Sequence, residues 1–271
     1  MQHQYLPDWR TVPQLSGLGD LPHPPKQLYY QGVWNAEIFT NCVAIIGSRR
    51  MTEYGRRVIE KIIPQLVFEK KTVVSGFMYG VDQYAHAVCM ENGGKTVAVL
   101  GWGIATARTE EDKKLADRII QTGGLLLSEW EDQQPTLWTF PVRNRIVAAL
   151  CRDVIVIEAA EKSGSLITAT IAHKLKRNLW AVPGPITSKL SFGTNKLIAE
   201  GKARIWIEEN VQQPLPIDDP FLRVLGDEAL TANDIARKLH MSVETVGAQL
   251  SMLQLTGSLI ERDGKYYVGK N

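Results

Sequence analysis

Runs of apolar residues alternate with amphipathic segments over most of the chain. The first run, residues 42–46 (CVAII), is continuously apolar, which is typical of a strand buried on both faces. Further strands are predicted at residues 72–74, 96–100, 125–128, 154–158, 179–182 and 204–207. Helices are predicted between them, at residues 52–69, 81–91, 110–121, 141–150, 165–175 and 195–200. This alternation indicates right-handed βαβ units, so we expect the α/β class, with a doubly wound, mostly parallel sheet.

Prolines modify this pattern at three places. Residues 1–40 are rich in Pro and aromatic residues, so we expect an irregular lead-in that packs on the main domain, with one short strand near residues 27–30. Pro64 is expected to kink or split the first helix, because its ring does not fit a regular helix interior. Pro141 is expected at the first position of the fourth helix, where a missing N–H costs nothing.

The C-terminal part of the chain has a different character. Residues 211–220 are rich in Pro and Asp and predict a linker. Three helices are then expected at residues 221–225, 232–239 and 243–255, followed by a hairpin of residues 259–262 and 266–268 around Asp263-Gly264. This order predicts a winged helix-turn-helix. The expected division is a lead-in (1–40), a main domain (41–210), a linker (211–220) and a winged helix domain (221–271).

Composition and charge exclude several classes of protein. The 271 residues are 44% hydrophobic, which excludes a mainly disordered or collagenous chain. The 31 Lys and Arg against 29 Asp and Glu give a net charge of +2, which argues against a protein that is basic throughout. Residues 211–271 hold 6 basic and 8 acidic residues, a net charge of −2, which leaves +4 for residues 1–210. A local basic patch in the main domain therefore remains compatible with the composition.

The cysteines and the termini indicate a cellular location. Cys42, Cys89 and Cys151 show no metal-ligand spacing, so we expect buried thiols in a reducing compartment. No apolar stretch of about 18 residues is present, so no transmembrane helix and no membrane partner are expected. The N-terminus lacks a basic start with an apolar core, so we expect a cytoplasmic protein.

Glycine and serine follow nearly every predicted strand. In a doubly wound sheet these loops share one edge, where ligands bind. They are Gly47-Ser48-Arg49-Arg50, Ser75-Gly76 with Gly80, Gly101-Trp102-Gly103, Ser163-Gly164-Ser165 and Pro183-Gly184-Pro185. Glycines admit a close ligand, and helix N-termini with serine hydroxyls bind anions, so we favour an anion site over a set of tight turns.

Basic residues on this edge indicate which anion. Neither G-x-G-x-x-G nor G-x-x-x-x-G-K-[ST] occurs, so the dinucleotide and P-loop fingerprints are absent. Arg49 and Arg50 stand in the first loop, Arg143, Asn144 and Arg145 open the fourth helix after Phe140, and Lys162 stands beside Ser163. Arginines with an aromatic ring favour phosphodiester contacts with base stacking, the mode of single-stranded nucleic acid binding. A structural Arg pair and a core Phe are the alternatives.

Catalytic groups are sparse. Asp82 and His86 are spaced as a pair on one helix, but we favour a structural role because no G-x-S-x-G nucleophile accompanies them. Glu129 and Glu158 follow strands and either bind a ribose hydroxyl or hydrogen-bond loop amides. No metal-ligand set and no cofactor motif occur, so we expect no enzyme activity, no metal and no cofactor.

Taken together, the loops resemble those of the bacterial DNA-processing protein A family, also called Smf. The matching stretches are VAIIGSRRMTEYG (43–55), SGFMYGVDQYAH (75–86), GGKTVAVLGWG (93–103), GGLLLSEW (123–130), FPVRNRIVAAL (140–150), SGSLITAT (163–170), AVPGPI (181–186) and SFGTNKLI (191–198). They cover about 160 residues in the order of the family, and their combination is specific.

The resemblance implies a function for the main domain. Members have an extended Rossmann-like domain that binds single-stranded DNA, forms a homodimer, and protects incoming strands and loads the RecA recombinase on them during natural transformation. By position, the DNA pocket would hold Gly47, Ser48, Arg49, Phe140, the Arg143-Asn144-Arg145 helix start, and Ser163-Gly164-Ser165, while Arg50 and Lys162 are our additions from their place in the loops. The family is not known for enzyme activity, in line with the sparse catalytic groups.

This chain departs from the family at several points. Members often carry an N-terminal helical module that residues 1–40 are too short to hold. Met78-Tyr79 replaces a small residue with an often basic neighbour, and IATARTEED replaces the usual Asp and Tyr-Pro turn after Gly103. The predicted recognition helix, residues 243–255, has one Glu and no Lys or Arg, which favours a protein contact over duplex DNA.

Two other functions use the same features. A nucleotide sensor or a nucleoside-monophosphate hydrolase would use the same glycine edge, but such hydrolases carry P-G-G-x-G-T where this chain has Pro183-Gly184-Pro185. A transcription regulator would use the winged helix, against which the acidic recognition helix argues. A single-stranded DNA-binding recombination mediator is therefore the function that the sequence favours.

Overall fold

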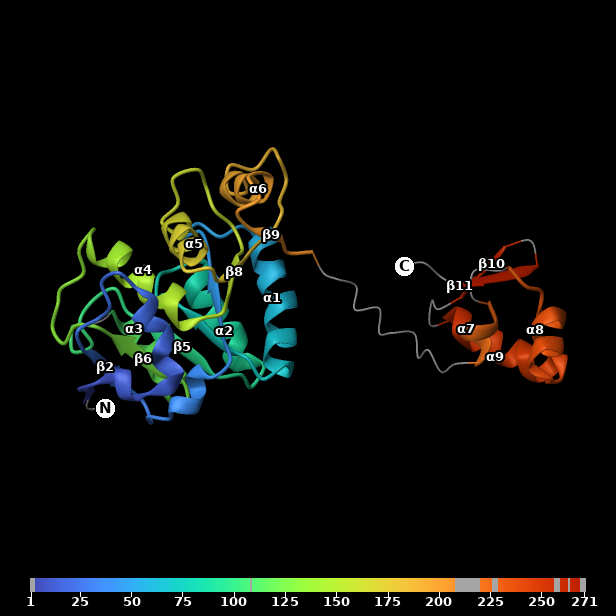
Figure 1. Ribbon diagram of the computed structural model, residues 1–271, viewed down its shortest axis with the longest axis horizontal. Helices are drawn as coiled ribbons and strands as arrows, with labels where there is room; N and C mark the ends of the chain where they lie inside the picture. Colours follow the sequence, from blue (N-terminus) through green and yellow to red (C-terminus); the bar gives the residue numbers. More distant parts are fainter. Residues whose placement is uncertain are drawn as a thin grey trace. The chain divides into compact units, whose positions relative to one another are not determined.

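The computed structural model describes residues 3–107, 109–207, 220–225, 229–255, 259–262 and 264–268. The chain divides into two compact units, residues 1–207 and residues 208–271. Most of the predicted linker, residues 211–219, lies outside the described residues, as does Asp263 of the predicted hairpin turn. Each unit has its own hydrophobic core. Figure 1 shows the helices and strands of both units.

A mixed sheet forms the centre of the first unit. Within the described residues it has nine strands in the order β1-β2-β6-β5-β4-β3-β7-β8-β9. The parallel strands are β3 (Cys42–Ile46), β4 (Thr72–Ser75), β5 (Thr96–Val99), β6 (Leu125–Ser128), β7 (Asp153–Val156), β8 (Asn178–Ala181) and β9 (Arg204–Ile205). Strands β1 (Gln4–Leu6) and β2 (Leu28–Gln31) add an antiparallel edge beside β6. The mostly parallel α/β sheet that we predicted is therefore confirmed.

Helices cover both faces of this sheet. They are α1 (Glu53–Phe68), α2 (Val81–Glu91), α3 (Glu110–Gln121), α4 (Thr139–Leu150), α5 (Ser165–Lys174) and α6 (Phe192–Ala199). Alternate residues of β3 face opposite layers: Val43 and Ile45 pack with α1 and α2, whereas Ala44 and Ile46 pack with α4 and α5. Burial on both faces explains why β3 is apolar at every position.

Neither proline interrupts its helix, and Pro141 does not take the predicted first position. Helix α1 runs through Pro64 without being split, because its cap at Thr52 and the buried Ile59, Ile63 and Leu66 hold it on both sides of the proline. Helix α4 begins at Thr139, so Pro141 is its third residue. The first-turn N–H groups of a helix have no partner within it, so this position tolerates proline as well as the first does.

The lead-in packs against the sheet and α4. It contains three 3-10 helices, η1 (Trp9–Thr11), η2 (Pro13–Asp20) and η3 (Ala36–Phe39). Trp9, Leu15 and Leu18 are buried in one core with residues of α4, and the Trp9 indole donates to the Pro25 carbonyl at 2.8 Å. The predicted strand near residues 27–30 is β2, whereas β1, which is only three residues long, was not predicted.

The second unit contains helices followed by a hairpin. Its elements are α7 (Pro220–Leu225), α8 (Ala232–Leu239), α9 (Val243–Leu255), β10 (Leu259–Arg262) and β11 (Lys265–Val268). Thr231 and Asp234 form a capping box at the start of α8, and His240 ends that helix with a φ of 54°. The element order is the predicted one, and the winged helix-turn-helix assignment itself stays a prediction.

Two further observations bear on the sequence predictions. Cys42, Cys89 and Cys151 are buried and free, which confirms the prediction of buried thiols. No helix in the described part of the chain has both the length and the apolar character that crossing a bilayer requires.

Strand β3 lies between β4 and β7, so the chain leaves it toward one side of the sheet and later returns to the other. The carboxyl ends of β3 and β7 therefore form a switch point, where doubly wound sheets bind ligands.

Candidate nucleic-acid interface

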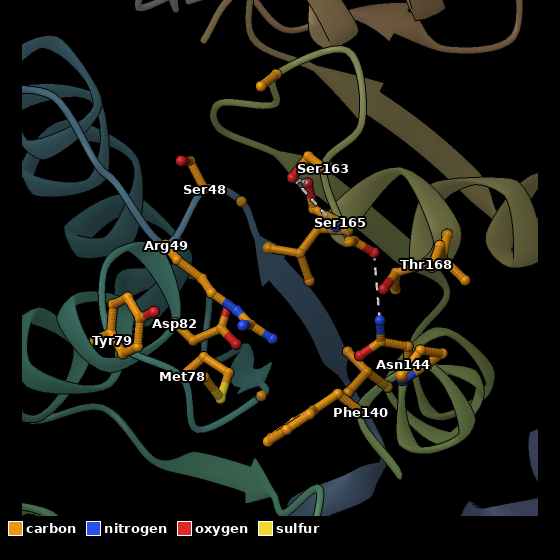
Figure 2. A pocket seen from close by; sticks show the side chains of 18 of the residues that line it. Ser48, Arg49, Met78, Tyr79, Asp82, Phe140, Asn144, Ser163, Ser165 and Thr168 are labelled. Carbon is orange, nitrogen blue, oxygen red and sulfur yellow. Dashed lines mark hydrogen bonds between the residues drawn. The ribbon is translucent and has the colours of Figure 1, made fainter. Parts of the chain in front are cut away.

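A cavity of about 530 Å³ opens at the switch point between β3 and β7. The loops after β3, β4 and β7 and the starts of α4 and α5 line it (Figure 2). The cavity, called the switch-point pocket below, brings together these predicted residues: Gly47, Ser48, Arg49, Arg50, Phe140, Arg143, Asn144, Lys162, Ser163, Gly164 and Ser165. Arg145 is the predicted site residue that it does not include.

Arg49 and Phe140 form the centre of the pocket. The Arg49 side chain is exposed, and its Cζ lies 5.2 Å from the centroid of the Phe140 ring (Figure 2). Phe140 is half-buried and meets Trp102 edge to face, with centroids 6.2 Å apart. At Gly101 a Cβ would lie 2.6 Å from Phe140 Cδ1, so only glycine admits the ring there. Phe140 therefore packs against Trp102 and Gly101 and also lines the pocket. Its position is intermediate between a core residue and an exposed stacking surface.

Glycines near the pocket mostly admit protein atoms, not a ligand. A Cβ at Gly47 would lie 2.6 Å from Val81 Cγ2, and one at Gly80 would lie 2.4 Å from the Ser48 carbonyl oxygen. Gly80 also has a φ of +87°, which favours glycine. These two glycines are therefore explained by close packing of the protein itself. The Ser48 hydroxyl is also used within the loop, where it accepts from the Arg50 N–H at 2.9 Å.

The start of α5 has a different character. No atom lies within 4 Å of the position of a Cβ on Gly164, and this N-cap residue has no side chain to cap the helix. The Ser163 hydroxyl accepts from the Ser165 N–H at 3.4 Å. The Ser163 and Ser165 hydroxyls lie 2.8 Å apart, and Asn144 Nδ2 donates to the Gly164 carbonyl at 3.3 Å (Figure 2). Lys162 is exposed beside them. This corner combines a helix N-terminus, hydroxyls and a cation, which together suit an anion.

Arg143 is part of the pocket wall. It is 3% exposed, and its Nη1 donates to the Val99 carbonyl at 2.7 Å. A Cβ at Gly76 would lie 2.0 Å from Arg143 Nη1 and 2.2 Å from Asp82 Oδ2, so the two groups converge there. Burial raises the pKa of Asp82, while the positive charges of Arg143 and Arg49 lower it. Arg143 therefore favours the charged form of Asp82, and its hydrogen bond to Val99 holds α4 in place, as the structural alternative proposes.

Arg145 and the two loop glutamates are also occupied. Arg145 Nη1 lies 2.6 Å from Glu129 Oε2, and both side chains are largely buried. Our prediction that Arg145 contacts the ligand is not supported by this geometry, because the ion pair holds it outside the pocket lining. Glu158 accepts from the Thr52 N–H at 2.9 Å and from the Thr52 hydroxyl, and so anchors the start of α1. The loop-amide interpretation therefore holds for Glu158, and the ribose interpretation does not.

His86 has no free nitrogen for catalysis. Nε2 lies 2.7 Å from the Gly76 carbonyl, and Nδ1 lies 2.6 Å from the Thr96 hydroxyl. The Gly76 carbonyl can only accept, so Nε2 donates to it. The Thr96 hydroxyl beside Nδ1 also donates to the Val73 carbonyl at 2.7 Å, so both ring nitrogens are held in a buried hydrogen-bond network. Burial lowers the pKa of His86 to about 4. The predicted structural role of His86 agrees with these contacts, and no described group of three His, Cys, Asp or Glu residues is placed to hold a metal.

Three apolar residues at the rim were not predicted. Leu137, Tyr79 and Ile167 line the pocket and are 91%, 58% and 42% exposed. They come from the loops after β6 and β4 and from α5. An aromatic residue beside Gly80 was visible as a departure from the family, but nothing in the sequence indicated that Leu137 would be exposed. The rim offers apolar surface next to the cations, which suits nucleobases.

Known proteins resemble this chain in sequence and in structure. Residues 7–214 match the family model of the DNA recombination-mediator protein A. The chain is 42% identical over 185 residues to the DNA processing protein DprA of Streptococcus pneumoniae, covering 68% of this chain and 64% of that protein. It is 34% identical over 193 residues to the DNA processing protein DprA of Bacillus subtilis, covering 71% of this chain and 65% of that protein. The chain thus spans slightly less than two thirds of these two relatives.

A solved structure has the same architecture. It is DNA processing protein A from Helicobacter pylori, described for its single-stranded DNA binding mode. The two structures agree with a TM-score of 0.67 at 31% identity, over 76% of this chain and 91% of that chain.

Replacing Glu158 by Gln is expected to destabilise the first unit by about 1–3 kcal/mol, because the Thr52 N–H and hydroxyl lose a charged acceptor. Urea unfolding followed by tryptophan fluorescence measures this unit, since all seven Trp lie in residues 1–207. The control is Glu161→Gln, an exposed carboxylate in the same loop, with an expected change below about 0.5 kcal/mol. Equal effects of the two substitutions would contradict the anchoring role of Glu158.

Acidification is expected to weaken the first unit through His86. Its native pKa of about 4 lies below the ordinary value of 6.5, so the unfolded chain takes up this proton first as the pH falls. The contribution of neutral His86 to the free energy of unfolding is complete above pH 6.5. It falls by about 3 kcal/mol as the pH decreases toward 4. Urea midpoints at several pH values should show a shallower decline for His86→Gln than for the natural chain. Parallel declines would mean that His86 does not titrate in this way.

Proposed function

This chain belongs to the DNA recombination-mediator protein A family, and we propose that it binds single-stranded DNA in the switch-point pocket. The observation that carries the proposal is the exposed Arg49 guanidinium over the half-buried Phe140 ring, in the same cavity as the serine-rich start of α5. Phosphates and bases thus find partners a few ångströms apart within one cavity.

The charge of the pocket supports a phosphodiester ligand. Among the described residues that line it, Arg49, Arg50, Arg143 and Lys162 are basic, and Asp82 is the single carboxylate. Arg143 offsets the charge of Asp82, so Arg49, Arg50 and Lys162 remain for phosphates. The total charge of the chain, +2, conceals this concentration of cations.

The apolar groups of the pocket support a single strand in place of a duplex. Phe140 and the exposed rim residues Tyr79, Leu137 and Ile167 present flat or apolar surfaces, which bind unpaired bases by stacking. Stacking does not discriminate strongly between bases, since every base has a π-face. Binding is therefore expected to depend weakly on sequence and strongly on salt.

The relatives carry the further steps of the proposal. The matched proteins are named DNA processing proteins, and the Helicobacter pylori structure is described for its binding of single-stranded DNA. On that likeness we assign this chain the family role: protection of incoming single strands, homodimerisation through the first unit and loading of the RecA recombinase during natural transformation. Neither a catalytic step nor a cofactor is part of this role.

The second unit takes a different part in the proposal. We assign residues 221–271 to a winged helix that contacts protein, joined by a linker at 211–220 to the main domain (41–210) and its lead-in (1–40). Helix α9 supports a protein contact, because the recognition helix of a duplex reader needs cations and Val243–Leu255 contains no Lys or Arg.

Arg49→Ala is expected to weaken binding of fluorescent oligo-dT by about tenfold or more, because a phosphate contact and a stacking partner are lost together. Fluorescence anisotropy at low and moderate salt measures this loss. The slope of log K against log salt should fall by about 0.7 for one lost contact. The control is Arg152→Ala, an exposed arginine immediately before β7, at the opposite edge of the sheet, with affinity unchanged.

Two results would overturn the proposal. One is the absence of single-strand binding by the full chain at low salt. The other is an equal loss of affinity for Arg49→Ala and Arg152→Ala, since only Arg49 lines the pocket. A matched duplex of the same length should bind more weakly than the single strand.

A further inference from the structure

A second hollow adjoins the switch-point pocket on the α1 and α2 side. Its volume is about 480 Å³, and Arg56 of α1, Gln83 and Tyr84 of α2, and Leu115 of α3 line it. Arg49 and Arg50 line both hollows, so the two are contiguous. This hollow, called the α1–α2 groove below, is the more open of the two.

The groove contains a stacked arginine. Arg56 Cζ lies 4.6 Å from the centroid of the Tyr84 ring, and the Tyr84 hydroxyl donates to Glu60. The ring is therefore fixed and supports one face of the guanidinium. The Arg56 side chain remains 47% exposed, although its Nε lies 3.4 Å from Glu53 Oε2.

The charges in the groove favour an anion. Among the described residues that line it, Arg49, Arg50 and Arg56 are basic and none is acidic. Glu53 lies 3.4 Å from Arg56, but both side chains are exposed, and such a pair contributes at most about 1 kcal/mol. A phosphate can therefore replace Glu53 without a large loss. Asp112 lies at the margin and is hydrogen-bonded to Gln83 at 2.8 Å.

The geometry points to a second subsite for the same strand, a step that rests on the function proposed above. The single strand continues from the switch-point pocket across Arg49 and Arg50 into the α1–α2 groove. There a phosphate contacts Arg56 and Arg50, and a base stacks on the Arg56–Tyr84 pair. Planar guanidinium groups serve as stacking partners for bases as well as phosphate ligands.

Continuity favours a strand over a separate small ligand. The two arginines at the junction, Arg49 and Arg50, belong to both hollows, so a nucleotide bound in one places its neighbour at the other. Proteins that bind single strands in one domain typically cover about 4–16 nucleotides, more than one pocket of this volume accommodates. A strand of this length needs further basic surface next to the pocket, and the α1–α2 groove provides it.

The test compares two lengths of oligo-dT, about 4 and about 16 nucleotides, on the full chain. Arg56→Ala is expected to leave the affinity for the short oligomer within about twofold and to weaken binding of the long one by about fivefold or more. Tyr84→Leu should have the same selective effect, because it removes the support of the guanidinium. The control is Arg57→Ala, the exposed neighbour on α1 that lines neither hollow.

The outcomes separate the two proposals. If Arg49→Ala abolishes binding of both lengths while Arg56→Ala affects only the long one, the subsite is supported. If Arg56→Ala and Tyr84→Leu match Arg57→Ala at both lengths, the subsite is overturned and the switch-point pocket stands. If the natural chain binds neither length, the proposed function fails and the subsite fails with it.

Discussion

The buried guanidinium of Arg143 ties together the elements that build the pocket. It extends from α4, donates to the Val99 carbonyl after β5, and meets Asp82 of α2 beside Gly76. A charge removed from water needs such partners, so the three elements are fixed relative to one another. Because α4 is fixed, Phe140 and Asn144 project from its first turns into the cavity, and Arg49 lies over Phe140. The exposed binding groups thus depend on a charge that itself has almost no access to the ligand.

Much of the fold was predictable because the sheet is buried on both faces. Every residue of β3 is buried, so its apolar run was recognisable in the sequence, and the same holds for β5 and β6. Strand β1 was missed because three residues give no periodicity. Pro64 does not split α1, because the apolar stripe of this helix outweighs one missing hydrogen bond.

The loops that form the site were predictable from the sequence. Which of their residues line the cavity and which are structural was less predictable. The strand-end loops converge because a doubly wound sheet brings its carboxyl ends to one edge. The sequence did not show which of Arg143, Asn144 and Arg145 faces the cavity. Successive residues of a helix point about 100° apart, and the sequence does not determine how the helix is rotated. Of these three residues, Asn144 lines the pocket and is partly exposed. Arg143 lines the pocket but is buried, and Arg145 pairs with Glu129 outside the lining. Glycines misled similarly, because close approach of Val81 to Gly47 requires the same residue as close approach of a ligand.

Photo-crosslinking tests most directly whether the single strand lies in the switch-point pocket. A dT oligomer carrying 4-thiothymidine is irradiated with the full chain, and the attached peptides are identified by mass spectrometry. Adducts are expected at Phe140 and at Tyr79, the two aromatic residues that line the pocket among those described. Adducts confined to residues 229–255 of the second unit, or to the amino-end edge of the sheet around Arg152, would contradict binding at the switch point.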